Sequence, residues 1–213
     1  FAYRPHLDGL RAVAVLMVFV FHAAPEALPG GFIGVDVFFV LSGSLIASIL
    51  LVQSDGDGIR LADFYRRRLQ RLLPAAFAVI LTVIAAESIW GSVLELGNRR
   101  REALATVFYV ANWNLIGQAD DYFAEALDPS PLRHMWSLAI EEQFYLVWPI
   151  VLVLALKLVG PRRSLLTGIV VVAIATSAAL MTLQYTPLET SRLYYGTDTR
   201  LFQPLAGALL ALL

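Results

Sequence analysis

The stretch DGLRAVAVLMVFVFH, from Asp8 to His22, predicts the kind of fold that this chain adopts. Ten residues without an ionisable side chain separate Arg11 from His22. On an α-helix these two residues point about 20° apart and stand roughly 16 Å from one another along the axis. A cation and an imidazole on one face of an apolar helix are costly in lipid. We therefore expect this face to look into protein or water.

The composition is that of a membrane protein. Of the 213 residues 58% are hydrophobic and 15% are charged, whereas a soluble domain has about 25% charged residues. The net charge of −1 indicates no nucleic-acid partner, and the lack of cysteine excludes disulfides, thiolate metal sites and a cysteine nucleophile. By itself the first apolar run also fits a cleaved signal peptide. The further apolar runs favour a polytopic protein in which it is the first span.

The apolar runs predict an all-α fold, a polytopic transmembrane helical bundle. The spans are expected at about 10–24, 31–52, 75–91, 134–157 and 165–183, with another helix starting at 201. Residues 60–74 are expected to form a basic amphipathic segment that ends at a proline, and 184–200 a polar loop. Residues 103–117 are short for a crossing, which predicts a re-entrant or interfacial segment. We expect one membrane-embedded domain over 1–213 that continues beyond Leu213.

Cations in the loops predict the orientation. If residues 103–117 do not cross the membrane, three groups of cations lie on the same side of it. These groups precede the first span, follow the second span and follow residue 156. This places the N-terminus in the cytoplasm, on the evidence of Arg4, Arg11, Arg60, Arg66, Arg67, Arg68, Arg71, Lys157, Arg162 and Arg163. Four cations oppose this positive-inside rule, because they would lie on the other side: Arg99, Arg100, Arg101 and Arg133.

Polar side chains within or beside the spans are the candidate site residues. Arg68 and Arg71 are helix neighbours, which fits either a membrane-surface anchor or a fork that grips phosphates. Imidazole changes charge near neutral pH, so His22 is either a general base or a histidine bonded to a neighbouring helix. Asp36 shares a face with small residues, and it is either half of a buried ion pair, for example with Arg11, or catalytic.

Two acids interrupt the span that begins HMWSLAIEEQFYLVWP. His134, Glu141 and Tyr145 are expected on one helical face and Glu142 on the neighbouring one, so at least one glutamate should point inward. These acids are either catalytic or part of a structural network with Gln143 and Tyr145. Near the last helix, Asp198 and Arg200 form either an inward pair or a helix cap.

The chain resembles the membrane acyltransferase-3 family, the bacterial O-acyltransferases of the O-antigen acetylase type. Five stretches carry the resemblance in family order: YRPHLDGLRAVAVLMVFVFH, GGFIGVDVFFVLSGSLI, FYRRRLQRLLP, PLRHMWSLAIEEQFYLVWP and YYGTDTR with LAGALLA. The chain departs from the family pattern at Ser44, where an aromatic is usual, and at Met135, where threonine is frequent.

The resemblance implies roles for individual residues. The family's arginine–ten residues–histidine pattern falls on Arg11 and His22, its RxxR pattern on Arg68 and Arg71, and its acidic pair on Glu141 and Glu142. His22, Glu142 and Glu141 are then the expected catalytic residues, and Arg68, Arg71 and Arg11 are expected to bind the acyl donor. The supporting residues expected from the same analysis are Asp36, Asp8, Ser42, His134, Tyr145 and Arg200.

The resemblance also implies a membrane O-acyltransferase of the cell envelope. It would move an acyl group, usually acetyl, from cytoplasmic acyl-CoA to a hydroxyl of an extracytoplasmic carbohydrate, either a polysaccharide or a lipid-linked sugar. Acyl-CoA is a co-substrate here, and we expect no resident cofactor and no metal. Direct transfer and an acyl-histidine intermediate both remain open. The rival class is a transporter or flippase for a lipid-linked sugar, since intramembrane charges also serve proton relays.

Overall fold

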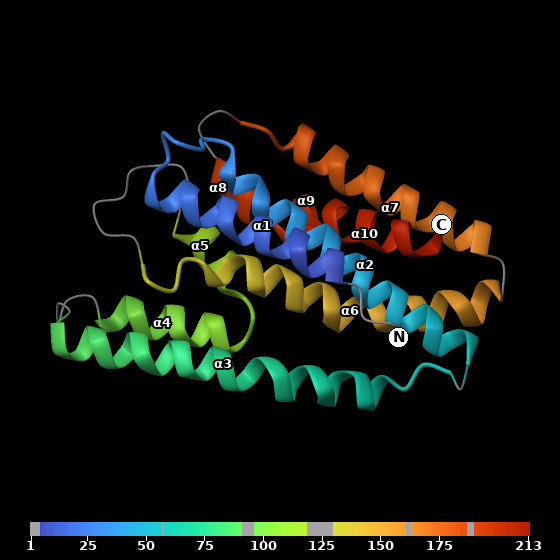
Figure 1. Cartoon of the computed structure of the whole chain (residues 1–213), viewed down its shortest axis with the longest axis horizontal. Helices are drawn as coiled ribbons and strands as arrows, with labels where there is room; N and C mark the ends of the chain where they lie inside the picture. Colours follow the sequence, from blue (N-terminus) through green and yellow to red (C-terminus); the bar gives the residue numbers. More distant parts are fainter. Residues whose placement is uncertain (1–4, 57, 91–95, 119–129, 161–162, 187–189) are drawn as a thin grey trace. The chain divides into compact units, whose positions relative to one another are not determined.

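The fold is helical throughout the part of the chain that the structure describes. A computed structural model describes residues 5–56, 58–90, 96–118, 130–160, 163–186 and 190–213. Its elements (Figure 1) are α1 (Pro5–Ala23), the short 3₁₀ helix η1 (Gly31–Ile33), α2 (Gly34–Asp55), α3 (Leu61–Trp90), α4 (Leu96–Val107), α5 (Ala111–Gly117), α6 (Met135–Val159), α7 (Arg163–Leu183), α8 (Thr190–Tyr195), α9 (Thr197–Arg200) and α10 (Phe202–Leu212). The prediction of an all-α fold is confirmed.

Five helical segments of the described chain are long and apolar enough to cross a bilayer. They cover Pro5–Ala23, Gly31–Asp55, Leu61–Ile89, Met135–Leu158 and Arg163–Leu183. Many apolar side chains on these helices are exposed, as expected of surfaces that face lipid rather than water. The protein is therefore a multi-pass membrane protein, and the predicted spans are confirmed.

The chain divides into two compact units. The first comprises residues 1–59, 147–180 and 201–213, and the second comprises residues 60–146 and 181–200. The division falls within α6, whose N-terminal half belongs to the second unit.

Glycines allow very close helix packing in the first unit. A Cβ on Gly43 of α2 would overlap the carbonyl oxygen of Pro204 in α10, and one on Gly207 of α10 would overlap that of Val40. A Cβ on Gly34 would likewise overlap the backbone of α1 at Ala14. Small residues at such contacts bring helix backbones together where lipid supplies no hydrophobic driving force. The glycines of the GGFIG and LSGS stretches therefore hold α1, α2 and α10 in place.

Two hydrogen bonds between helices also stabilise the first unit. Gln203 of α10 donates from Nε2 to Oδ1 of Asp36 in α2 at 2.8 Å. The backbone N–H of Phe202 donates to the hydroxyl of Ser177 in α7 at 3.0 Å. Both ties join α10 to helices distant in sequence, so the helix orientation rests on hydrogen bonds as well as on close packing.

The second unit combines a helix hairpin with an aromatic cluster. Helices α3 and α4 lie side by side (Figure 1), with Ile80, Ala103 and Leu132 forming a small apolar core at their contact. The ring of Trp136 at the start of α6 contacts those of Tyr194 and Tyr195, with centroids 4.9 and 5.4 Å away. These rings anchor α8 to the beginning of α6.

One sequence expectation about α3 was wrong. The basic segment 60–74 and the span 75–91 form a single helix, with Pro74 in its interior. Proline removes one backbone hydrogen bond, but membrane helices tolerate it. Thirty residues extend about 45 Å, whereas the hydrocarbon core is about 30 Å thick. The arginine-rich first turns can therefore lie at the membrane surface while the rest crosses it.

Two other segments differ in detail from the expectation. Residues 103–117 are divided between α4 and α5, with Tyr109 between them at a φ of 54°, and neither helix is long enough to cross a bilayer. This agrees with a non-crossing segment, and its re-entrant character stays a prediction. The expected polar loop 184–200 contains two short helices, α8 and α9, because Tyr194, Tyr195 and Thr199 are buried there.

We expect Gly43→Ala to destabilise the protein, because its methyl group would overlap the backbone of α10. Overpacking of this kind costs roughly 1–3 kcal/mol. The matched control is Gly168→Ala in α7, where a Cβ meets no atom within 4 Å and alanine favours the helix by up to about 1 kcal/mol. Thermal unfolding of the purified protein in detergent measures both. Equal melting temperatures for the two variants would contradict the close contact.

Candidate functional site

A charged and aromatic cluster in the second unit is the candidate site. Arg68 of α3 points toward α6, where its Nη2 lies 3.6 Å from Oε1 of Glu142. Its guanidinium carbon is 3.4 Å from the centre of the Tyr145 ring. The side chains of Arg68 and Glu142 are only 20% and 12% exposed. A buried ion pair needs further polar partners to offset its desolvation, which makes this cluster unlike a surface anchor.

The acidic pair of α6 is divided between two contacts. The hydroxyl of Tyr145 donates to Oε1 of Glu141 one turn earlier in the helix, whereas Glu142 faces Arg68. Tyr65 of α3 donates its hydroxyl hydrogen to the Leu146 carbonyl at 2.7 Å, which fastens α3 to α6 beside the cluster. The contact between Glu141 and Tyr145 belongs to the structural alternative considered from the sequence, and Glu142 points inward, as expected of at least one glutamate.

A hydrogen-bonded network continues from this cluster toward α5 and α9. Gln143 donates from Nε2 to the Tyr109 carbonyl at 2.7 Å and to Oδ1 of Asn112 at 3.0 Å. Asn112, which is fully buried, donates from Nδ2 to the Tyr195 carbonyl and to the Thr197 hydroxyl, both at 2.9 Å. Thr197 in turn donates to Oε1 of Gln143. The closed network fixes Tyr109 beside α6.

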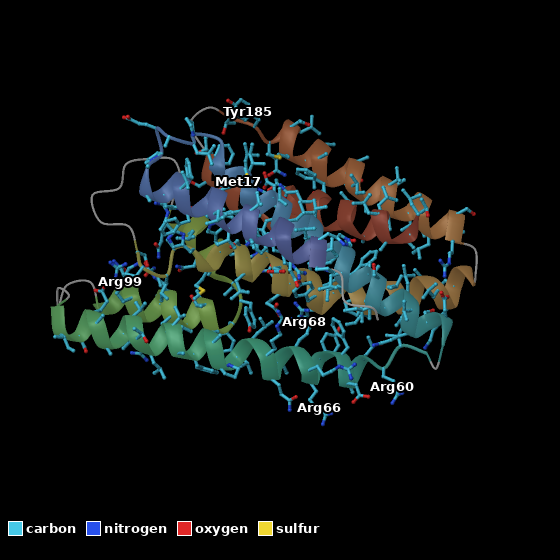
Figure 2. The ribbon with its side chains drawn as sticks, viewed as in Figure 1. Met17, Arg60, Arg66, Arg68, Arg99 and Tyr185 are labelled. Carbon is cyan, nitrogen blue, oxygen red and sulfur yellow. The ribbon has the colours of Figure 1, made fainter. Side chains whose placement is uncertain are left out.

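The arginines of α3 separate into two environments. Arg66, Arg67 and Arg71 are exposed, whereas Arg68 is partly buried. Figure 2 shows Arg66 and Arg68 leaving α3 on opposite sides. Arg67 and Arg71 stand one turn apart on the exposed side, so together they present two guanidinium groups. The two members of the RxxR pattern thus have different surroundings.

His22 ends α1 in the first unit and is exposed. Its Nδ1 lies 2.8 Å from the Val18 carbonyl oxygen. A bond to a carbonyl requires a proton on Nδ1, so in the neutral ring the lone pair is on Nε2. Near the other end of α1, Arg11 donates from Nη1 to Oδ1 of Asp8 at 3.2 Å, where the two side chains are 28% and 48% exposed.

The remaining predicted residues are distributed over both units. Asp36 accepts from Gln203, and the buried Ser42 precedes the close contact at Gly43. His134 is exposed and lies just before α6, with its carbonyl accepting from Ser137 at 3.2 Å. Arg200 is buried and donates from Nε to the Tyr194 carbonyl at 3.0 Å.

Three partners were missed from sequence. Gln203 binds Asp36, Arg192 binds Asp198, and the Tyr109 carbonyl accepts from Gln143, the residue that follows Glu142. No spacing rule connects residues so far apart in sequence as Gln203 and Asp36.

The described residues include no group of three or more His, Cys, Asp or Glu side chains able to hold a metal ion.

Asp198 contributes a pH-dependent stability that we expect to be measurable. Arg192 donates to both of its carboxylate oxygens, at 2.8 and 2.6 Å, and these bonds lower the pKa of Asp198. Because the pKa of Asp198 is lower in the folded protein than its unfolded-state value of about 3.9, the ionised carboxylate stabilises the fold at pH values above that unfolded-state pKa. This stabilisation is lost as the pH falls through the folded-state pKa. Wild type should therefore melt above Asp198→Asn at pH 6, with the difference closing below about pH 4.

Asp55→Asn is the matched control, because Asp55 forms an exposed pair with Arg163, and such pairs contribute little. A constant melting difference between wild type and Asp198→Asn from pH 7 to pH 3 would contradict the assignment.

Comparison with known proteins places these elements in a family. The acyltransferase domain family matches residues 4–213. The chain is 46% identical over 211 residues to a protein named peptidoglycan O-acetyltransferase OatA from Listeria monocytogenes, covering 98% of this chain and 34% of that protein. It is 45% identical over 212 residues to the putative peptidoglycan O-acetyltransferase YrhL of Bacillus subtilis, covering 99% of this chain and 33% of the relative.

A protein named O-acetyltransferase OatA from Staphylococcus aureus is 42% identical over 211 residues, which are 98% of this chain and 34% of the relative. No solved structure matches the chain. The chain thus spans about one third of the length of these curated relatives. Because the family match extends over nearly every residue, including the helices that hold Arg68, Glu142 and His22, this chain belongs to the acyltransferase-3 family.

Proposed function

We propose that this protein is a membrane O-acetyltransferase that moves an acetyl group from cytoplasmic acyl-CoA to a hydroxyl of a cell-surface carbohydrate. Family membership and the names of the relatives support O-acetyl transfer, and two of those names give peptidoglycan as the acceptor. Peptidoglycan is therefore the first acceptor to test. The observation that carries the proposal is the partly buried ion pair between Arg68 of the RxxR pattern and Glu142 of the acidic pair.

The exposed and buried arginines of α3 suggest how the donor is bound. Arg67 and Arg71 present two guanidinium groups on the exposed side of the helix, suited to the phosphates of a nucleotide. Arg68 faces Glu142 and Tyr145, where it would contact the uncharged arm of the acyl-CoA donor rather than its phosphates. This arrangement refines the sequence hypothesis that Arg68 and Arg71 act together on the phosphates.

The proposed orientation places these arginines in the cytoplasm. Five arginines lie between residues 60 and 71, at the beginning of a helix longer than the hydrocarbon core is thick. Arg4 and Arg162, which also entered the orientation argument, lie outside the described residues. A cytoplasmic N-terminus puts the start of α1 and the start of α3 on the side where acyl-CoA is found.

In the proposed reaction His22 acts as the general base. Nε2 takes the proton of the acceptor hydroxyl, whose oxygen attacks the thioester carbonyl. The C–S bond then breaks, and the CoA thiolate receives the proton back from the imidazolium. The bond from Nδ1 to the Val18 carbonyl would hold the ring in the tautomer that this step needs. Glu141 and Glu142 would orient the reactants, since placement supplies much of the acceleration.

A second route passes through an acyl-histidine. In that route Nε2 of His22 attacks the thioester directly, CoA leaves, and the acceptor hydroxyl later takes the acetyl group from the ring. The net reaction is the same. Trapping radiolabel on the protein in the absence of acceptor would select this route over direct transfer.

Membranes containing the full-length protein should transfer radiolabel from acetyl-CoA to peptidoglycan fragments. His22→Ala should lower the rate by roughly 10²–10⁴-fold, the usual contribution of a general base. His6→Ala is the matched control, because His6 is an exposed histidine of the same helix without an assigned role. The amount of folded protein is followed by fluorescence-detected chromatography.

Two results would contradict this proposal. Sugar movement across the membrane without acyl label would indicate the rival transporter or flippase, and full activity of a folded His22→Ala variant would remove the assigned base. Mass spectrometry of cell-envelope glycans with and without the gene should show a difference of one acetyl group per modified sugar.

Arg68→Lys should lower transfer at subsaturating acetyl-CoA by roughly tenfold or more, because lysine keeps the charge but loses the planar stack on Tyr145 and the geometry toward Glu142. Arg66→Lys, on the opposite side of the same helix, should change transfer little. Equal effects of the two substitutions would mean that α3 contributes only net positive charge.

A further inference from the structure

Among the buried polar atoms of the second unit without a hydrogen-bond partner in the described residues, three belong to residues at or near the Arg68–Glu142 ion pair. They are Nε of Arg68, Oε1 of Glu142 and the hydroxyl oxygen of Tyr109. The 3.6 Å between Arg68 Nη2 and Glu142 Oε1 allows ionic attraction but is too long for a hydrogen bond. Leaving buried polar groups unpaired is unfavourable, so such groups mark places where something else supplies the partners.

Tyr109 belongs with the other two residues. Burial is the main cause that raises the pKa of its phenol, the nearby charge of Glu142 raises it further, and Arg68 opposes the shift. Its backbone carbonyl accepts from Gln143, the residue that follows Glu142 in α6. The phenol therefore lies within the electrostatic reach of the ion pair.

The backbone of Tyr109 is held in a conformation that a bulky residue rarely adopts. Its φ is 54°, in the left-handed region. The bond from Gln143 holds it there, and Gln143 is fixed in turn by Asn112 and Thr197. Such conformations persist where the surroundings over-determine them, and they are concentrated at ligand sites.

Side chains along α3 change in character in a fixed order. The exposed Arg67 and Arg71 come first, with Arg68 turned inward between them. A small, partly open apolar pocket follows, lined on α3 by Leu73, Ala76, Phe77 and Ile80 and on the other side by Thr106, Val107 and Tyr109. Charged, polar and apolar surfaces thus follow one another over about four helical turns.

We propose that Tyr109, together with Arg68 and Glu142, binds a secondary amide of the pantetheine arm of the acyl-CoA donor. This inference rests on the proposed function. The amide supplies what the three atoms lack: its carbonyl oxygen accepts from the Tyr109 hydroxyl and Arg68 Nε, and its N–H donates to Glu142. Acyl-CoA presents phosphates, then amides, then a thioester, which is the order of the surfaces along α3.

An acetamido group on a sugar acceptor carries the same amide chemistry, so the experiment must separate the two sources. Initial rates with the full-length protein in membranes give KM for acetyl-CoA and, separately, for the acceptor. Tyr109→Phe should raise KM for acetyl-CoA by roughly five- to tenfold, the effect of one buried hydrogen bond. The kcat and the KM for the acceptor should stay within about twofold, since only donor binding loses a contact.

The control is Tyr185→Phe, at a tyrosine that is 63% exposed and labelled in Figure 2. It should leave every parameter unchanged. Tyr109→Phe should also keep the melting temperature of wild type, because its hydroxyl has no hydrogen-bond partner to lose in the part of the chain that the structure describes. Added CoA should raise the melting temperature of wild type more than that of Tyr109→Phe, by mass action.

Each outcome decides between the proposals. An unchanged KM for acetyl-CoA, or a large loss of thermal stability, would overturn the role of Tyr109 and leave the proposed function standing. A raised KM for the acceptor alone would overturn the assignment to the donor. Wild-type protein that transfers nothing from acetyl-CoA would overturn the proposed function itself, and the donor amide with it.

Discussion

The need to place charge inside an apolar helical protein governs the second unit. The guanidinium of Arg68 is held between the carboxylate of Glu142 and the face of the Tyr145 ring. Removing either charge would leave the other buried and unpaired, which is strongly unfavourable. The pair therefore helps to fasten α3 to α6, and it places charged groups at their contact. Binding and chemistry are expected where such groups are left incompletely satisfied.

The first unit solves a different problem, that of bringing helices together without a hydrophobic driving force. Glycines at Gly34, Gly43 and Gly207 allow backbones to touch, and the hydrogen bond from Gln203 to Asp36 fixes the rotation of α10 against α2. Close contact and a buried hydrogen bond reinforce each other, because each requires the same relative position of the two helices. The histidine at the end of α1 is carried by this packed framework.

Sequence patterns predicted the spans well because length and hydropathy are one-dimensional properties. They failed at Pro74, where the basic segment was expected to end and the helix instead continues, as membrane helices allow. They also failed at 184–200, where polarity suggested a loop. There, Tyr195 is buried because Asn112 and Trp136 supply partners from other segments. Thr199 is buried as well, and its hydroxyl donates to the Leu193 and Gly196 carbonyls of the same segment.

The chain alone thus determined the membrane class, the places of the spans and the motif residues of the acyltransferase-3 family, since each depends on neighbours in sequence. Only the tertiary structure decided that Arg68 pairs with Glu142 while Arg71 stays exposed. It likewise decided that Asp198 binds Arg192 and that the Tyr109 carbonyl accepts from Gln143 in a left-handed turn. Helical periodicity states which side chains share a face. It does not state which face of another helix they meet, because that follows from the packing of all the segments together.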